Sequence, residues 1–341
     1  MDKNEKIRRV IEGEWIGEVP FSFWTHLPEI DRNPEQLAQA TVDLYRKYDL
    51  DLIKTLNNGM YATEDYGCEV DYSAVATGGV AKIVKSPITC YEDWANLPEL
   101  ELETAAVLQR ELDYLKRTLD LLDGEVPVLM TIFSPLTTAA KLAKGNISDY
   151  IAQDREGYLH QALERITSIT AALAAEAIRL GAAGIYFASQ MSSYDLIGSQ
   201  DYERYGRPYD LQVLAAAKEG WANALHAHGT NILFELLSDY PVALFNWHVW
   251  ESLPEPKQAQ FYTRKTILGG LNRMDVTQEN YNDLYHQIYR VLTDTGGKGV
   301  ILTPGCVVRH PFSEETIRFM IRIKKETEQL LFEHAQKEKS C

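Results

Sequence analysis

Two histidines separated by a single residue mark the segment best suited to chemistry. The stretch LHAHG contains His226 and His228 and ends in Gly229. Residues two apart on a strand share a face, so both imidazoles can point at one ion, and the glycine allows the chain to turn sharply. Cys306, in TPGCVV, offers a thiolate to the same set. Two nitrogen ligands and one sulfur ligand suit zinc and leave one position open, so the sequence predicts zinc at His226, His228 and Cys306.

The same residues also have a purely structural interpretation. Histidines can hydrogen-bond with each other in a protein interior, and a free cysteine is commonly a small buried side chain. The sequence lacks the residue patterns of two other common kinds of site. No predicted strand end carries the paired carboxylates of a glycosidase, and neither GxGxxG nor GxxxxGK[ST] occurs to hold a nucleotide phosphate.

Eight short apolar runs alternate with longer helical patterns over nearly the whole length. This order is typical of repeated βα units, and eight of them predict a closed (β/α)8 barrel. The expected strands are Val19–Trp24, Leu50–Leu56, Val126–Phe133, Gly184–Ala188, Trp221–Ala227, Val242–Trp247, Thr266–Leu271 and Gly299–Thr303. The expected helices are Pro34–Tyr48, Ala105–Leu122, Glu156–Leu180, Tyr202–Lys218, Ile232–Ser238, Gln278–Thr293 and Glu314–Ala335.

One stretch does not fit a βα unit. Residues 60–100 are rich in Gly, Tyr and Val and predict an inserted hairpin or small sheet that caps the mouth of the barrel. No internal repeat and no Pro/Ser/Gly-rich linker divides the chain. The sequence therefore predicts one barrel domain over residues 1–341.

In such a barrel the chemical groups come from the carboxyl ends of the strands and the loops after them. We expect polar residues there to orient the substrate for reaction: Asn57, Ser189, Gln190, Asn246 and Asn272. We expect a second group to contact the substrate: Trp24, His26, Asn58, Trp247, His248 and Arg273. Trp24 and the segment His248–Trp250 would give a mostly apolar wall, the alternative being that these tryptophans only pack helix on barrel.

The composition of the chain disfavours several classes of binding partner. The 341 residues carry 34 Lys plus Arg against 49 Asp plus Glu, a net charge of −15, which disfavours nucleic acid and anionic membranes. The four cysteines are too few and scattered for a disulfide framework, and no stretch has the length of a signal peptide core or a membrane span. These features favour small-molecule chemistry in a reducing cytoplasm.

Longer motifs resemble a known family. They are VPVLMTIFSPLTTAAKLAKGN, GAAGIYFASQMSSYDLIGSQDYERYGRPYDLQV, TILGGLNR and GVILTPGCVVRHPFSEETI. Together they make the chain similar to the uroporphyrinogen decarboxylase family of (β/α)8 barrels, whose relatives include zinc-dependent methyltransferases that act with corrinoid proteins. The resemblance spans nearly the whole length and implies the same fold.

The resemblance to the family's decarboxylases breaks down at the substrate-binding positions. Their MRQAGR segment, whose arginines hold the substrate carboxylates, has no counterpart in PFSFWTHLPE. Their strand-2 aspartate falls at Asn58, a substrate-contacting tyrosine falls near Lys141, and a histidine falls at Cys306. Only Ser189 matches. Because charged pairs are the strong contacts in such a site, we do not expect uroporphyrinogen decarboxylation.

The methyltransferase branch is the better match. Its HxCG motif and its second cysteine after strand 8 correspond to the HAHG stretch and to Cys306. The resemblance thus implies a zinc-dependent, methyltransferase-like enzyme acting on a small methylated substrate or a corrinoid. A decarboxylase of porphyrin biosynthesis and a non-catalytic barrel that binds a tetrapyrrole or corrinoid are the alternatives. The candidate partners are a corrinoid protein and a second copy of the chain.

Overall fold

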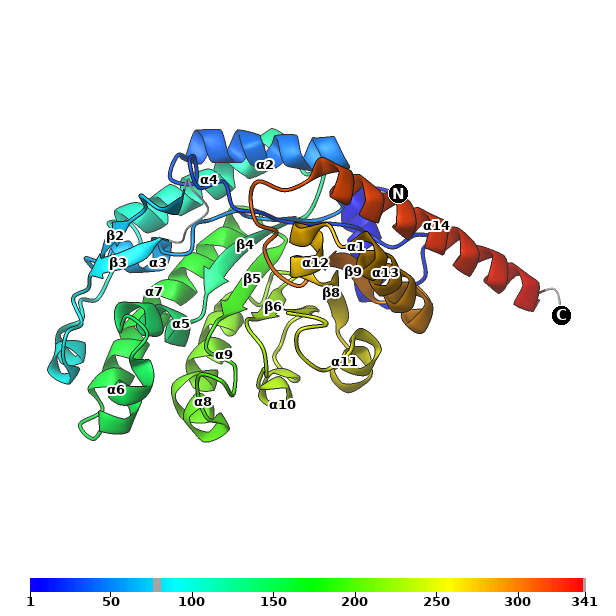
Figure 1. Ribbon diagram of the computed structural model, residues 1–341. Coiled ribbons are helices and arrows are strands. Elements are labelled where there is room, and N and C mark those ends of the chain that lie inside the picture. The colour runs from blue at the N-terminus through cyan, green and yellow to red at the C-terminus, as the bar shows by residue number, and fades with distance from the viewer. Residues whose placement is uncertain (76–80, 340–341) are drawn as a thin grey trace.

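Seven parallel strands curl into the wall of a barrel whose outside is covered by helices (Figure 1). The structure is a computed structural model and describes residues 1–75 and 81–339, with side chains as far as residue 333. The strands follow the order β1-β4-β5-β6-β7-β8-β9. Their bounds are β1 Ile53–Lys54, β4 Val128–Phe133, β5 Gly184–Ser189, β6 Ala224–Ala227, β7 Leu244–Trp247, β8 Thr266–Leu271 and β9 Val300–Pro304. Every residue of these strands is buried, as expected of a parallel sheet covered by helices.

The first expected strand closes the barrel without forming a regular ladder. Residues 20–25 lie between β9 and β1 and form isolated bridges in place of a ladder, Phe21 with Leu302 of β9 and Thr25 with Val308 in the loop after β9. On the other side, the Asp51 amide donates to the carbonyl of Phe21 at 2.9 Å. The predicted (β/α)8 barrel is therefore confirmed, with its first strand present as an extended segment.

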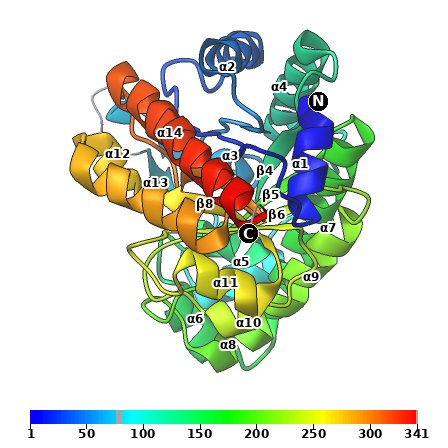
Figure 2. The ribbon, with the colours of Figure 1, turned by 90° about the vertical axis from the view of Figure 1, so that its right-hand side faces the viewer.

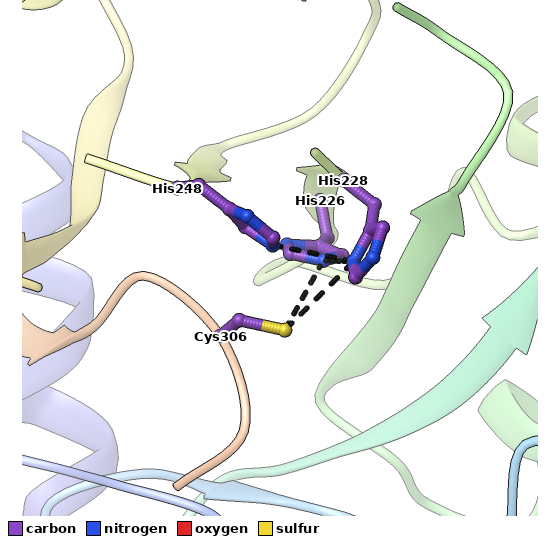
Figure 3. Close-up of side chains that lie close together, drawn as sticks. All are labelled: His226, His228, His248 and Cys306. Carbon is purple, nitrogen blue, oxygen red and sulfur yellow. Dashed lines mark hydrogen bonds between the residues drawn. The ribbon is translucent and has the colours of Figure 1, made fainter. Parts of the chain in front are cut away.

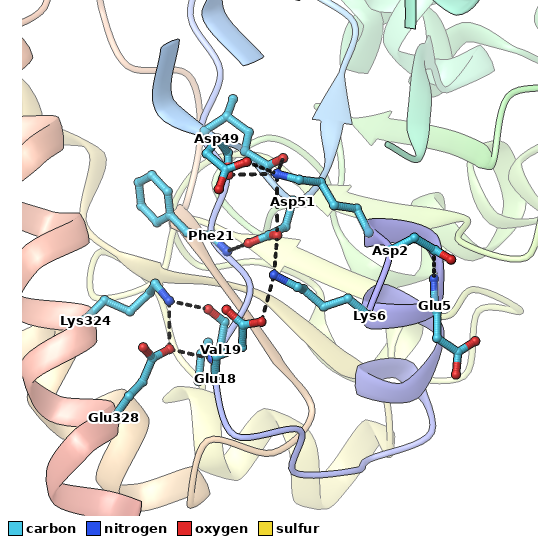
Figure 4. Close-up of polar contacts among 12 residues, drawn as sticks. Asp2, Glu5, Lys6, Glu18, Val19, Phe21, Asp49, Asp51, Lys324 and Glu328 are labelled. Atoms are coloured by element: carbon cyan, nitrogen blue, oxygen red, sulfur yellow. Dashed lines mark hydrogen bonds and ion pairs between the residues drawn. The ribbon is translucent and has the colours of Figure 1, made fainter. Parts of the chain in front are cut away.

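Side chains complete the hydrogen bonding of this segment, as Figure 4 shows. Glu328 accepts the amide hydrogen of Val19 at 2.5 Å, and the Lys324 ammonium donates to the carbonyl of Val19 at 2.7 Å. The same ammonium donates to Glu328 at 2.7 Å, and Asp51 accepts from the amide of Phe21 at 2.9 Å. Since Lys324 and Glu328 are buried, the last helix ties the first strand to the barrel.

Replacing Glu328 by Ala should lower the free energy of unfolding by about 3 kcal/mol, because the buried Lys324 charge would lose its counter-charge and the Val19 amide would lose its acceptor. Urea unfolding measures this. The matched control is Glu326→Ala, which removes an exposed pair with Arg322 on the same helix and should cost less than about 0.5 kcal/mol. Equal losses from the two variants would contradict the structural role of Glu328.

Helices follow most strands and form the outer layer. They are α1 Lys3–Ile11, α2 Pro34–Tyr48, α3 Tyr61–Glu64, α4 Ala106–Leu122, α5 Pro135–Leu142, α6 Ile147–Gln153, α7 Tyr158–Arg179, α8 Ser199–Tyr205, α9 Arg207–Ala216, α10 Phe234–Leu237, α11 Pro256–Thr263, α12 Arg273–Gln278, α13 Tyr281–Thr295 and α14 Glu314–Lys339. In Figure 2, α13 and α14 lie side by side, and the two helices are in contact. No helix in the described part of the chain is both long and apolar enough to cross a membrane.

Several helices differ from the expected pattern. The helix expected over residues 202–218 divides into α8 and α9 at Gly206, whose backbone lies against the ring of Tyr202 and which precedes the helix-interrupting Pro208. Six short helices were not expected from the sequence: α1, α3, α5, α6, α11 and α12. None is longer than the nine residues of α1, which is shorter than the window over which helical periodicity can be recognised.

The insertion lies outside the barrel sheet, as predicted. Strands β2 (Glu69–Asp71) and β3 (Lys82–Lys85) form a separate antiparallel pair, followed by a 3-10 helix, η2, at Tyr91–Asn96. Residues 76–80 of the predicted insertion lie outside the described residues. The hydroxyl of Tyr72, beside this pair, reaches the side-chain oxygen of Asn58 at 3.4 Å, which brings the insertion next to the end of β1.

Candidate metal centre

Three imidazoles and one thiol converge at the carboxyl ends of three strands (Figure 3). His226 is the penultimate residue of β6 and His228 comes directly after that strand, His248 comes directly after β7, and Cys306 comes two residues after β9. One ligand atom from each lies within 4.8 Å of all the others. His226, His248 and Cys306 are buried and His228 is partly exposed, so the cluster is open on the His228 side.

Four of the six separations between these atoms are close to those around a tetrahedral ion. With zinc–nitrogen and zinc–sulfur bonds of about 2.0 and 2.3 Å, neighbouring ligand nitrogens lie about 3.3 Å apart and sulfur lies about 3.6 Å from nitrogen. Here the Nδ1 of His228 lies 3.3 Å from the Nε2 of His226 and 3.2 Å from the Nε2 of His248. The Sγ of Cys306 lies 3.8 and 3.9 Å from His226 Nε2 and His228 Nδ1. The donor set therefore fits zinc.

Neighbouring residues present the His226 nitrogen in the form that a metal needs. The β6–β7 register places His226 beside Asn246, whose Oδ1 lies 2.5 Å from His226 Nδ1. The Asn246 amide group donates to the carbonyl of Leu268, which turns Oδ1 towards the imidazole, and the Tyr186 hydroxyl donates to the same oxygen. His226 Nδ1 therefore carries the hydrogen, and the Nε2 lone pair faces the cluster.

Replacing Asn246 by Ala should weaken zinc binding about 10-fold to 100-fold, because His226 would lose the hydrogen bond that fixes its tautomer. Competition with a chromophoric chelator measures the affinity. Asn246→Asp keeps an acceptor for the imidazole and should bind zinc nearly as well as the parent protein. Asn280→Ala, on the outer helix layer, is the control. A loss in Asn246→Asp as large as in Asn246→Ala would contradict the orienting role.

The imidazoles are neutral and the thiol is protonated in the metal-free cluster at neutral pH. Burial lowers the pKa of His228 to about 4 and that of His248 to about 2, and it lowers the pKa of His226 well below its usual range. Burial raises the pKa of the Cys306 thiol, while Arg273 and Lys54 oppose that rise. The three imidazole lone pairs are thus available to a metal, and only the thiol must lose a proton.

A glycine lets the β9 loop approach β7 closely enough to deliver Cys306. A Cβ at Gly305 would lie 2.5 Å from the carbonyl oxygen of Trp247 and 2.9 Å from the amide of Val249. These backbone atoms flank His248 on both sides. Only a residue without a side chain therefore allows Cys306 and His248 to meet.

The residues expected to orient the substrate do not form one group. Asn246 contacts His226, and the remaining four make other contacts. Asn57 donates to Glu111, and the Asn272 side chain accepts from the amide of Met274 at the start of α12. Ser189 lies 2.9 Å from the hydroxyl of Tyr202, and the backbone amide of Gln190 donates to Thr137.

Among the residues expected to contact substrate, His248 belongs to the metal cluster. Arg273 pairs with Glu251 at 3.3 Å, and Glu251 lies 3.9 Å from His248 Nδ1. Trp247 is buried against Phe245, and its indole N–H donates to the carbonyl of Ser252, so its side chain is used in packing.

Trp24, His26 and Asn58 lie across the barrel mouth from the strands that carry His226 and His248. They come at the ends of the first two strand segments. Trp24 packs edge-on against Tyr186, whose ring stacks on His226 at 5.3 Å. Sequence reasoning missed Tyr186 and Lys54. Strand periodicity could have identified both, because Tyr186 and Lys54 lie in expected strands and extend to the barrel interior, where the Lys54 ammonium lies 5.2 Å from the Tyr186 ring centre.

Comparisons with known proteins agree with the barrel. The family model described as uroporphyrinogen decarboxylase (URO-D) matches residues 5–327. A methyltransferase from Methanosarcina mazei is similar in structure, with a TM-score of 0.76 and 17% identity over 96% of this chain and 99% of that one. A protein from Listeria monocytogenes, titled a vitamin-B12 independent methionine synthase, has a TM-score of 0.50 and 13% identity over 92% and 98%. No curated protein sequence matches significantly.

Proposed function

Since this chain belongs to the uroporphyrinogen decarboxylase family, we propose that it is a zinc-dependent, methyltransferase-like member of that family. Its substrate would be a small methylated compound or a corrinoid carried by a partner protein. The single observation that carries the proposal is the convergence of His226, His228, His248 and Cys306 on one point. The similarity in fold to the Methanosarcina mazei methyltransferase is consistent with it.

His226, His228, His248 and Cys306 would hold the zinc ion, so His248 takes the position that the expected three-ligand set left open. When bound, zinc would supply Lewis-acid chemistry to a substrate atom that joins as a further ligand or replaces one of the four side chains. With three neutral imidazoles and one thiolate, the centre would carry a net charge of +1, which favours Lewis acidity over activation of a thiol.

The chain's own residues would position this centre and restrict access to it. Asn246 and Tyr186 orient His226, and the Glu251 carboxylate lies beside His248 Nδ1. His226, His248 and Cys306 are shielded from water, whereas His228 is partly exposed. A substrate would therefore approach along the His228 side, where Arg273 also lies partly exposed.

The decarboxylase alternative has less support. The position that corresponds to a substrate histidine in the family's decarboxylases is Cys306, which lies in the metal cluster. Asn58 replaces the strand-2 aspartate, and the first strand segment has no arginine near its end. The chain thus lacks the groups that would hold a polycarboxylate porphyrinogen in the manner of those enzymes.

Metal analysis of protein purified without a histidine tag tests the proposal. We expect about one zinc per chain, and in zinc-loaded protein we expect methylcobalamin to lose its methyl group to one of a panel of small thiols and amines. The same preparation should not convert anaerobically reduced uroporphyrinogen to coproporphyrinogen. Absence of stoichiometric metal would overturn the zinc centre, and efficient decarboxylation would overturn the choice of branch.

A further inference from the structure

A second set of nitrogen groups faces the metal cluster across the barrel mouth. Trp24 and His26 end the first strand segment, Lys54 and Asn58 belong to β1 and the loop after it, and Lys141 reaches over from α5. These elements are neighbours, because the first segment hydrogen-bonds to the start of β1 and β1 pairs with β4, which leads into α5. Lys141 donates to the carbonyl of Gly59, next to Asn58, at 2.5 Å.

Three of these groups have buried nitrogen atoms without a hydrogen-bond partner: Trp24 Nε1, His26 Nδ1 and Asn58 Nδ2. The indole and amide nitrogens can only donate a hydrogen bond, and imidazole Nδ1 can donate in one tautomer. Trp24 is 1% exposed and Asn58 is 4% exposed, so bulk water does not readily satisfy them. Buried donors without acceptors are uncommon in folded proteins and indicate a missing acceptor.

The two lysines lack a counter-charge. Lys54 is 5% exposed, and its ammonium contacts the carbonyl of Thr55 and the face of the Tyr186 ring. The Lys141 ammonium contacts the carbonyl of Gly59 and lies 3.6 Å from the centre of the Phe133 ring. In the described part of the chain neither lysine forms an ion pair with a carboxylate. Such burial of an unpaired cation is costly, and it is unusual in a chain with a net charge of −15.

These groups lie close to the cluster and to one another. The Lys54 ammonium lies 5.2 Å from the centre of the Tyr186 ring, which stacks on His226 at 5.3 Å and packs against Trp24 at 5.4 Å. In agreement with this placement, and beyond the larger effect of burial, the charges of Lys54 and Lys141 lower the pKa of His26, and the charge of Lys141 lowers the pKa of His228. A ligand at the metal centre would therefore have hydrogen-bond donors and positive charge on its other side. The three unpartnered nitrogen atoms and the two lysines at this side could all bind a negatively charged hydrogen-bond acceptor.

We propose that Lys54 and Lys141, with Trp24, His26 and Asn58, bind the carboxylate of an organic-acid substrate whose other end faces the His226/His228/His248/Cys306 cluster. The proposal names the substrate class of the site described above and rests on the proposed function for the role of the metal side. The lysine side of the mouth, made of Lys54, Lys141, Trp24, His26 and Asn58, needs no metal to form, so carboxylate binding there can be tested on the metal-free protein. It differs from the arginine-based carboxylate binding of the decarboxylases, because these cations come from β1 and α5.

The test compares propionate with propionamide, which has a similar shape and no charge. Saturation-transfer NMR on the metal-free full-length protein gives the dissociation constant of each. We expect propionate to bind roughly tenfold more tightly, the usual scale for a charge-assisted contact. Lys54→Met and Lys141→Met should each remove most of that preference. Lys116→Met, which changes an exposed lysine on the outer face of α4, should leave it intact.

Thermal unfolding of the same variants separates a binding role from a structural one. Removing an unpaired buried cation should maintain or raise the melting temperature of Lys54→Met without ligand, and the stabilisation that propionate gives to the parent protein should disappear. A structural lysine would instead lower the melting temperature. Equal binding of propionate and propionamide, or an unchanged preference in both lysine variants, would overturn the proposal.

Zinc uptake is measured on the same protein after zinc is added, so the carboxylate site and the metal centre can be contradicted independently. Propionate preference in protein that takes up no zinc would support the carboxylate site and overturn the metal centre. Stoichiometric zinc with no carboxylate preference in the metal-free protein would support the metal centre and overturn the carboxylate site.

Discussion

Zinc binding should weaken by about 100-fold to 1000-fold when His226 is replaced by Ala. The size follows from dividing the binding free energy of a four-ligand zinc site, about 10 to 16 kcal/mol, equally among its ligands, which gives about 2.5 to 4 kcal/mol for each. His226 Nε2 lies close to the ligand atoms of both His228 and Cys306, and Asn246 holds the other nitrogen of the ring in place. Competition with a chromophoric chelator measures the loss.

His286→Ala is the matched control, because His286 is an exposed histidine on α13, away from the cluster. It should bind one zinc with the affinity of the parent protein. His228→Ala should also lose most of the affinity, since His228 Nδ1 contacts the three other ligand atoms. If His226→Ala retained parental zinc affinity while remaining folded, the cluster would be a hydrogen-bonded histidine group and the zinc proposal would fail.

Much of the barrel could be predicted from the sequence because its strands are buried on both faces. A strand such as β4 or β8 appears as a continuous apolar run, and each run is followed by a clear helical pattern. The first segment, Val19–Trp24, was expected to be a regular strand, but it is an extended segment with isolated bridges. Its backbone groups are satisfied by Glu328, Lys324 and Asp51 from distant parts of the chain, and no local pattern encodes such contacts.

The candidate site could be predicted in part. His226 and His228 are recognisable because a strand places residues two apart on one face, and Cys306 because it follows the last strand. The position of His248 in the same cluster depends on the close approach of the β7 and β9 loops at Gly305, which is a tertiary contact. For Lys54 and Lys141, sequence reveals a lysine but not the absence of a carboxylate beside it, because that depends on packing of separate elements.

The metal side and the lysine side of the barrel mouth would attract ligands of opposite charge. The metal side offers neutral lone pairs from His226, His228 and His248, which attract a cation. The lysine side offers donors and positive charge, which attract an anion. A zinc ion at the first site would strengthen the field for an anion at the second, since all these charges lie in a largely water-excluded region. Zinc should therefore tighten propionate binding beyond the affinity expected of the metal-free protein.

Zinc affinity should rise about 100-fold between pH 6 and pH 8, because binding releases one proton and that proton comes from Cys306. Burial holds the pKa of this thiol above its ordinary value of 9.0, so it is protonated throughout the range. The pKa values of about 4 for His228 and about 2 for His248, with that of His226 also far below its usual range, keep the imidazoles neutral there. The affinity should thus change tenfold per pH unit.

Chelator competition at several pH values measures this slope, and Cys306→Ser isolates its origin. A serine hydroxyl does not need to lose a proton to occupy the position, so this variant should bind zinc more weakly with an affinity that is nearly independent of pH from 6 to 8. Cys90→Ser, which changes an exposed cysteine, should keep the parental slope. Below about pH 4 the slope should steepen, as His228 begins to hold a proton that zinc must displace. A slope of two or more protons near neutral pH would mean that the imidazoles are protonated in the metal-free protein, and an unchanged slope in Cys306→Ser would remove the thiolate from the ligand set.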